Sequence, residues 1–120
     1  MKFSQNTPIY TQIMNFIKGK VINGELNPGD KVPSVRELSS QLKINPNTIQ
    51  RAYGELEREG ITYTQRGMGT FIVEDNFIIT KLKKHMAQNI IDEFIIQMNN
   101  LGFYDESIIT LISQNLKMGN

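Results

Sequence analysis

The sequence of 120 residues contains no cysteine and no tryptophan. Without cysteine the chain has no disulfide, thiolate zinc site, iron–sulfur cluster or cysteine nucleophile, which fits a reducing compartment. Long hydrophobic runs are also missing, since a run such as Phe77-Ile78-Ile79 is far shorter than the roughly 20 residues that cross a bilayer. The first ten residues lack the apolar stretch and the cleavage site of a secretory signal. We therefore expect a cytoplasmic protein with no membrane partner.

Net charge is small as well, because 13 Lys+Arg against 12 Asp+Glu leave +1. A basic excess is the usual sign of a nucleic-acid partner. The charges are unevenly spread, however: residues 31–51 hold four cations and one carboxylate, whereas residues 55–59 hold three carboxylates and one arginine. The total charge therefore decides nothing about the partner.

Residues suited to catalysis are scarce. His85 is the only histidine, and beside Lys83 and Lys84 it is typical of a solvated side chain rather than a base or a metal ligand. The sequence has no glycine-rich phosphate loop, no paired-carboxylate site and no metal-ligand spacing. We expect no enzyme activity, no cofactor and no metal.

The first forty residues predict two helices. Thr7-Pro8 is typical of a helix start with Thr7 as the cap and Pro8 at the first helical position, and the helix should end near Asn23-Gly24. Ser34 and Glu37 have the spacing of a capping box, which starts a second, shorter helix. The apolar spacing of the first helix comes from Tyr10, Ile13, Met14, Ile17 and Val21.

A third helix and a β-hairpin follow. Asn45-Pro46 repeats the pattern of a cap followed by proline, and Gly60 ends the helix. Two β-favouring runs, 61–64 and 70–73, flank a loop whose glycines allow a tight turn. The third helix should bury Ile49, Ala52, Tyr53 and Leu56, which lie at i, i+3, i+4 and i+7.

Helical periodicity returns after Asp75, with one long helix ending at Gly102 and a last helix capped by Asp105. We place the domain boundary between residues 75 and 76, so that residues 1–75 form one domain and 76–120 a two-helix region. The last helix is too short to cover the long apolar stripe, which favours pairing with a second copy over a monomer whose helices fold back on the first three. The expected dimerisation residues are Leu82, Met86, Ile90, Phe94, Ile95, Met98, Ile108, Leu111 and Ile112.

Two helices joined by a short turn and followed by a hairpin make a winged helix-turn-helix. A recognition helix must bury one face and offer the other to base edges in the major groove. Asn47, Gln50 and Arg51 lie off the buried stripe, and these side chain types can bind adenine or guanine edges. Asn45 and Pro46 are fully explained as a helix start.

Two further positions favour an anion. Arg36 lies in the first turn of the second helix, where the helix dipole disfavours a cation unless an anion such as a phosphate lies opposite. The alternative is an ordinary surface arginine beside Glu37. Ser34 is explained primarily as the helix cap, and it is also a candidate donor to a phosphate. In the hairpin loop Arg66 can enter the minor groove, and the glycines let the backbone approach the sugar-phosphate chain; otherwise the loop is a plain turn.

The runs 26–38, 45–60 and 66–71 together resemble the GntR family of bacterial transcription regulators. The Asn-Pro-Asn-Thr helix start and a tail of two helices are similar to its small YtrA subfamily, whose members are dimeric repressors, often of operons encoding ABC transporters. Met68 replaces a frequent wing cation, and Gly54 replaces a larger helix former. The resemblance implies DNA contact by Arg36, Asn45, Asn47, Thr48, Gln50, Arg51, Arg66, Gly67 and Gly69.

The sequence thus predicts a mainly α (α+β) protein, with an N-terminal winged helix-turn-helix of three helices and a β-hairpin wing, followed by two dimerisation helices. The expected function is sequence-specific binding of a two-fold symmetric, double-stranded DNA operator by a homodimeric repressor. The alternative is a winged-helix module that binds another protein and no DNA. Any small-molecule effector stays open.

Overall fold

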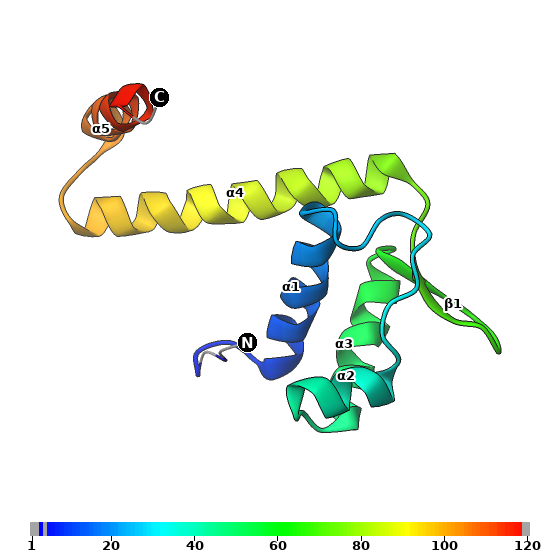
Figure 1. Cartoon of the computed structure of the whole chain (residues 1–120). Helices are drawn as coiled ribbons and strands as arrows, with labels where there is room; N and C mark the ends of the chain where they lie inside the picture. Colours follow the sequence, from blue (N-terminus) through cyan, green and yellow to red (C-terminus); the bar gives the residue numbers. More distant parts are fainter. Residues whose placement is uncertain (1–2, 4, 119–120) are drawn as a thin grey trace. The chain divides into compact units, whose positions relative to one another are not determined.

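The computed structural model describes residue 3 and residues 5–118, and within them it contains five helices and one hairpin (Figure 1). The order of elements confirms the predicted winged helix-turn-helix followed by two helices. The elements are α1 (Ile9–Ile22), α2 (Val35–Leu42), α3 (Pro46–Arg58), β1 (Thr62–Gln65), β2 (Gly69–Ile72), α4 (Asn76–Asn100) and α5 (Asp105–Met118).

The chain divides into two compact units, residues 1–83 and 84–120. The sequence placed the boundary between residues 75 and 76, eight residues earlier. The first two turns of α4 belong to the N-terminal unit, where Leu82 is only 6% exposed and the Cδ1 atom of Ile78 lies 3.8 Å from the position of a Cβ on Gly60. The winged helix therefore includes the beginning of α4.

The core of the N-terminal unit gathers around α3. Its fully buried side chains come from every helix before the hairpin and from β2, and each contributes about 1.5–3 kcal/mol through burial. The largest of these side chains are Ile13, Ile17, Leu38, Ile49, Leu56 and Ile72. The buried residues of α3 are the four that the helical spacing predicted.

The start of α1 differs from the prediction by one residue. Pro8 occupies the N-cap in an extended conformation, with φ −54° and ψ 143°, and no side chain caps the helix. The Pro8 carbonyl accepts the first helical bonds from Thr11 N and Gln12 N at 3.1 and 3.3 Å. Thr7 therefore is not the cap. Its carbonyl instead accepts a 2.8 Å hydrogen bond from the side-chain amide (Nε2) of Gln12.

The capping box of α2 is confirmed. The Glu37 backbone N–H donates to Ser34 Oγ, and the Ser34 N–H donates to Glu37 Oε1, both at 3.0 Å. The N–H of Ser34, followed by its hydroxyl, lowers the pKa of the Glu37 carboxyl. This contribution to stability is present above the usual pKa range of glutamate and is lost as acid protonates Glu37.

The hairpin pairs β1 with β2 in antiparallel register, Thr62 opposite Ile72 and Gln65 opposite Gly69. The segment before α2 runs along the free side of β2: Ile72 N donates to Asp30 O at 2.8 Å, and Val32 N donates to Thr70 O at 2.9 Å. This pairing ties the base of the hairpin to the helical part of the unit.

In the C-terminal unit, Gly102 adopts φ 92° and ends α4 as predicted. Asp105 does not cap α5, because it is the first helical residue and the Tyr104 carbonyl accepts the first helical bond, from Ile108 N at 3.0 Å. The Tyr104 N–H is satisfied by Ser107 Oγ at 3.0 Å. Among the described residues, no helix has the length and apolarity needed to cross a membrane.

We predict that Ser34→Ala lowers the free energy of unfolding by about 1 kcal/mol, because the Glu37 backbone N–H at the start of α2 loses its side-chain acceptor. Urea unfolding followed by circular dichroism measures the change. Ser40→Ala is the matched control, since Ser40 is exposed in the same helix and has no capping role. Equal losses in the two variants would contradict the capping role of Ser34.

Candidate nucleic-acid interface

The α3 helix has one buried face and one polar face. Asn45 Oδ1 accepts the Asn47 N–H at 2.8 Å, and Pro46 follows at the first helical position, as the sequence predicted. On the polar side Asn47, Gln50 and Arg51 are exposed, as is Asn45, and Thr48 is half-buried. The first two turns of α3 therefore present amide, hydroxyl and guanidinium groups to solvent.

Two contacts hold α3 against the segments before it. The Tyr53 hydroxyl donates to the Pro33 carbonyl at 2.6 Å, and burial, followed by the negative charge of Glu37, raises the pKa of Tyr53, so the phenol keeps its proton at neutral pH. At the other end, the Lys18 ammonium of α1 lies 2.8 Å from Glu59, with the Lys18 side chain only 11% exposed. These contacts fix α3 relative to α1 and to the start of α2.

The start of α2 presents Ser34 and Arg36, both exposed. The Glu37 carboxylate is bound to the backbone of Ser34, and within residues 5–118 Arg36 forms no ion pair. The Arg36 guanidinium therefore lies near the positive end of the α2 dipole without a protein anion to offset it, a position that suits a phosphate.

Arg51 has a partner that the sequence did not reveal. Its guanidinium lies over the ring of Tyr10, 3.9 Å from the centroid. Glu55, one turn further along α3, pairs instead with Arg58 at 3.1 Å. The helical spacing of α1 assigned Tyr10 to the apolar stripe, and only the packing of α1 on α3 shows that it contacts the polar side of α3.

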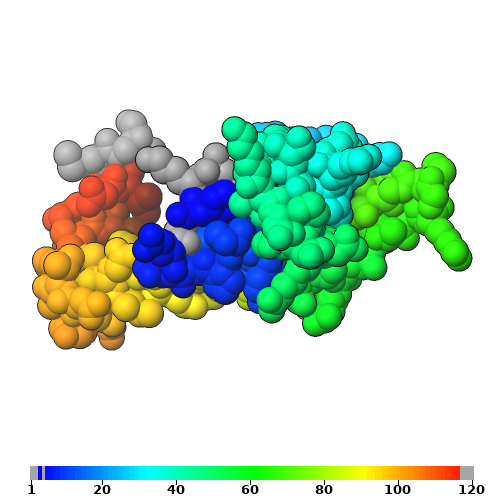
Figure 2. Space-filling model, turned by 90° about the horizontal axis from the view of Figure 1, so that it is seen from below, coloured from blue at the N-terminus to red at the C-terminus, as the bar shows by residue number. Residues whose placement is uncertain are grey.

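The wing places Arg66 and Gly67 at the tip of the hairpin, where both are exposed, and Figure 2 shows the hairpin standing out from α2 and α3. The glycines meet the expectation of an unusual backbone, with φ 78° at Gly67 and 123° at Gly69. Lys31 is the second residue that sequence reasoning left out of the site. A Cβ at Gly69 would lie 2.6 Å from Lys31 Cε, so the lysine stem crosses the wing at Gly69.

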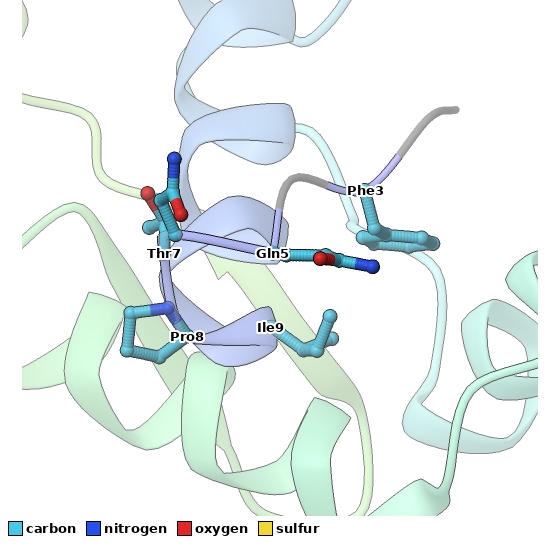
Figure 3. Close-up of a pocket in the computed structure, with 6 residues that line it drawn as sticks. Phe3, Gln5, Thr7, Pro8 and Ile9 are labelled. Carbon is cyan, nitrogen blue, oxygen red and sulfur yellow. The ribbon is translucent and has the colours of Figure 1, made fainter.

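A hollow beside the first residues that the structure describes offers little to a charged ligand. An open hollow of about 580 Å³ lies at the start of α1, and Figure 3 shows Phe3 and Gln5 beside Ile9, with Thr7 and Pro8 further along the segment. Its lining residues carry no ionisable side chain. Within the described part of the chain no three His, Cys, Asp or Glu residues are grouped as metal ligands would be.

In the C-terminal unit, apolar side chains of α4 and α5 remain exposed. Ile90 is 70% exposed, and Phe94, Ile95 and Ile112 are more than one-third exposed. Phe94, Met98, Leu111 and Ile112 also line a groove of about 360 Å³. Leu82 and Ile108 differ from this set, because both are buried within the single chain and have no surface to offer a second copy.

The family model for bacterial regulatory proteins of the gntR family matches residues 9–72, from the first residue of α1 to the last residue of β2. The match covers more than half of the chain. The chain belongs to the GntR family.

A GntR relative, the HTH-type transcriptional repressor YtrA of Bacillus subtilis (strain 168), is 47% identical over 93 residues, which are 72% of each chain. A GntR family transcriptional regulator from Listeria monocytogenes has a similar structure, with a TM-score of 0.84 and 42% identity over 93% of this chain and 98% of that one. The AraR(DBD) crystal structure in complex with operator ORR3 matches 61% of this chain and 86% of that one, with 32% identity and a TM-score of 0.55.

These findings make the chain a GntR-family transcriptional regulator with a DNA-binding winged helix, and they confirm the resemblance to YtrA. Because its GntR relatives are transcriptional regulators, the expectation that the chain is not an enzyme is also confirmed.

We predict that Lys31→Gln makes the slope of log K against log salt for DNA binding less negative by about 0.9, the value for one phosphate contact on duplex DNA. The physical reason is that the ammonium beside Gly69 adds one cation to the wing, where Met68 has none. Salt titrations of binding measure the slope. Lys20→Gln is the control, since Glu25 already binds the Lys20 ammonium at 2.8 Å; equal slopes for wild type and Lys31→Gln would remove Lys31 from the interface.

Proposed function

We propose that the chain is a homodimeric repressor that binds a two-fold symmetric DNA operator, with the start of α3 in the major groove and the hairpin over the minor groove. The observation that carries this proposal is the division of α3 into two faces. Ile49 and Ala52 are fully buried, whereas Asn47, which precedes them, and Gln50, which lies between them, are exposed. A helix held in this way can enter the groove without giving up its own packing.

The proposed contacts fall into three groups. Asn47, Gln50 and Arg51 read base edges, since amides bind adenine and guanidinium binds guanine in bidentate fashion. Backbone phosphates are bound by exposed donors around the starts of α2 and α3, and the wing enters the minor groove. The phosphate group comprises Ser34, Arg36, Asn45 and Thr48, and the wing group comprises Arg66, Gly67 and Gly69.

The hydroxyl and amide groups in these sets also have structural roles, which limits what they can offer DNA. Ser34 Oγ accepts the Glu37 N–H, and Asn45 Oδ1 accepts the Asn47 N–H. Each oxygen is therefore occupied, and the Ser34 hydroxyl also interacts with the Glu37 carboxyl, whereas the Asn45 amide N–H groups are free to donate to a phosphate. Capping and phosphate binding are compatible at Asn45, whereas at Ser34 a phosphate competes with the Glu37 carboxyl for the hydroxyl proton.

Dimerisation is supported by the exposed apolar side chains of the C-terminal unit. The 14 residues of α5 are too few to cover the apolar residues of the 25-residue α4, and Ile90 and Phe94 remain in solvent. A second copy buries the same face on both chains, and the resulting two-fold axis requires a two-fold symmetric operator. The proposed interface is Met86, Ile90, Phe94, Ile95, Met98, Leu111 and Ile112.

Repression of transcription is supported by the relative that is named a repressor, YtrA. The likeness to that subfamily extends the proposal to operons that encode ABC transporters. The protein-interaction alternative finds no support in α3, because its exposed side near the N-terminus is polar rather than apolar.

We predict that Arg51→Ala weakens binding by about 1–3 kcal/mol and relaxes the sequence preference, as expected for loss of a bidentate base contact. The probe is the duplex that the wild-type chain selects from a random-sequence pool, which should show a dyad, and a mobility-shift titration measures the affinity. Arg58→Ala is the matched control, because Arg58 lies at the far end of α3 and pairs with Glu55. Unchanged binding by Arg51→Ala would exclude Arg51 as a reader, and failure to select any duplex would refute the proposed function.

We predict that Phe94→Asp converts a dimer into monomers, because a carboxylate in the proposed interface has no partner when buried. Light scattering measures the mass, and circular dichroism checks that α4 and α5 stay helical. Ile96→Asp is the matched control: Ile96 is also exposed on α4, but two residues along the helix it points away from the Phe94 face. A persistent dimer in Phe94→Asp would place the interface elsewhere.

A further inference from the structure

The contact between Tyr10 and Arg51 joins α1 to the proposed reading face of α3. Tyr10 lies in the first turn of α1 and is half-buried, whereas Arg51 lies in the second turn of α3 and is exposed. The Arg51 guanidinium contacts the Tyr10 ring and not Glu55, although Glu55 lies one turn further along α3; Glu55 instead pairs with Arg58. The Arg51 side chain is therefore held by the ring and not by Glu55.

The ring occupies only one face of the guanidinium. The five N–H donors of arginine lie in the plane of the group and point outward from its edge, so a guanidinium stacked on a ring still has its donors free. Among the described residues, no carboxylate forms an ion pair with Arg51. The stacked arrangement thus leaves a bidentate donor that is fixed in direction and that no carboxylate of the described residues occupies.

The position of the ring is itself fixed by the core. Lys18 is eight residues after Tyr10, and Glu59 is eight residues after Arg51, so the ion pair of the buried Lys18 with the exposed Glu59 joins the same two helices about 12 Å further along. The two contacts show that α1 and α3 run in the same direction side by side (Figure 1). Ile13 and Ile17, which lie on α1 between Tyr10 and Lys18, are fully buried.

We propose that Tyr10 is a positioning residue for DNA reading: its ring holds the Arg51 guanidinium over α3 so that the in-plane donors meet the DNA in one orientation. Arginine otherwise loses the freedom of a long, flexible side chain when it binds. Holding the side chain in the free protein removes part of that cost. The inference rests on the proposed role of Arg51 in DNA binding.

The test compares Tyr10→Leu and Tyr10→Phe, each with and without Arg51→Ala, on the duplex selected by the wild-type chain. Tyr10→Leu should bind about two- to fivefold more weakly, the size of an exposed cation–π contact. Tyr10→Phe keeps the ring and should bind as the wild type does. In the Arg51→Ala background Tyr10→Leu should have no further effect, because there is no guanidinium left to hold.

Three results would overturn the inference and leave the proposed function intact: wild-type affinity in Tyr10→Leu while Arg51→Ala binds weakly, an equal loss from Tyr10→Leu in both backgrounds, or a loss in Tyr10→Phe equal to that in Tyr10→Leu. The second result would mean that the ring touches DNA itself or supports only the fold. If Arg51→Ala bound the duplex as tightly as the wild type, the proposed role of Arg51 would be refuted, and the inference with it.

A measurement without DNA tests the stack directly in the wild-type protein. The Nε–H proton of a guanidinium above an aromatic ring resonates upfield of its usual position. In the free wild-type protein the Arg51 resonance, identified by its disappearance in Arg51→Ala, should therefore lie upfield of those of Arg36, Arg58 and Arg66. A resonance among those of the other three arginines would overturn the inference.

Discussion

The structure of the N-terminal unit depends on the requirement that α3 be packed from one side only. Ile49, Ala52 and Leu56 are fully buried, and α3 packs against α1, α2 and β1. None of these covering elements extends over Asn47 and Gln50, which remain exposed. The packing energy of a small core thus holds the helix in place and leaves its polar side available for a ligand.

The pairing of charges explains how a chain with a net charge of +1 presents a cationic surface. Within the described residues, the carboxylates of Glu25, Glu55 and Glu59 bind Lys20, Arg58 and Lys18. The carboxylate of Glu37 is bound to the backbone of Ser34. By contrast, no carboxylate pairs with the arginines on α2, in the second turn of α3 or in the wing. These four carboxylates are bound within the fold, so the cations around α3 remain available to the proposed DNA partner although the total charge is near zero.

The sequence was sufficient for elements whose signals are local. The Asn45 cap and the Ser34–Glu37 box depend on neighbours within three residues, and the buried face of α3 depends on a period that the helix itself imposes. At the starts of α1 and α5 the same signals were ambiguous. Proline suits the N-cap as well as the first turn, and an aspartate suits the first turn through the helix dipole as well as the cap. A shift of one residue at each helix was the result.

The contacts that the sequence did not predict join segments far apart in the chain. Tyr10 and Arg51 are 41 positions apart in the numbering, and Lys31 reaches Gly69 because residues 29–32 run along β2. Nothing in the local pattern of either residue distinguishes it from a stripe residue or a solvated lysine. The burial of Leu82 was missed for the same reason: its spacing on α4 matches that of Ile90 and Phe94, and only the tertiary fold shows that it belongs to the winged helix.

The burial of Leu82 and Ile108 also bears on how the proposed dimer gains affinity for DNA. With these two residues inside the chain, the surface left for self-association is the exposed set around Ile90 and Phe94. A single winged helix contributes one recognition helix and one wing, whose phosphate contacts weaken steeply with salt. Joining two such units makes the second binding step intramolecular, so each half-site needs only modest affinity. In the proposed dimer the apolar face of α4 therefore contributes to operator binding without touching DNA, and the strength of that face sets the protein concentration at which the operator is occupied.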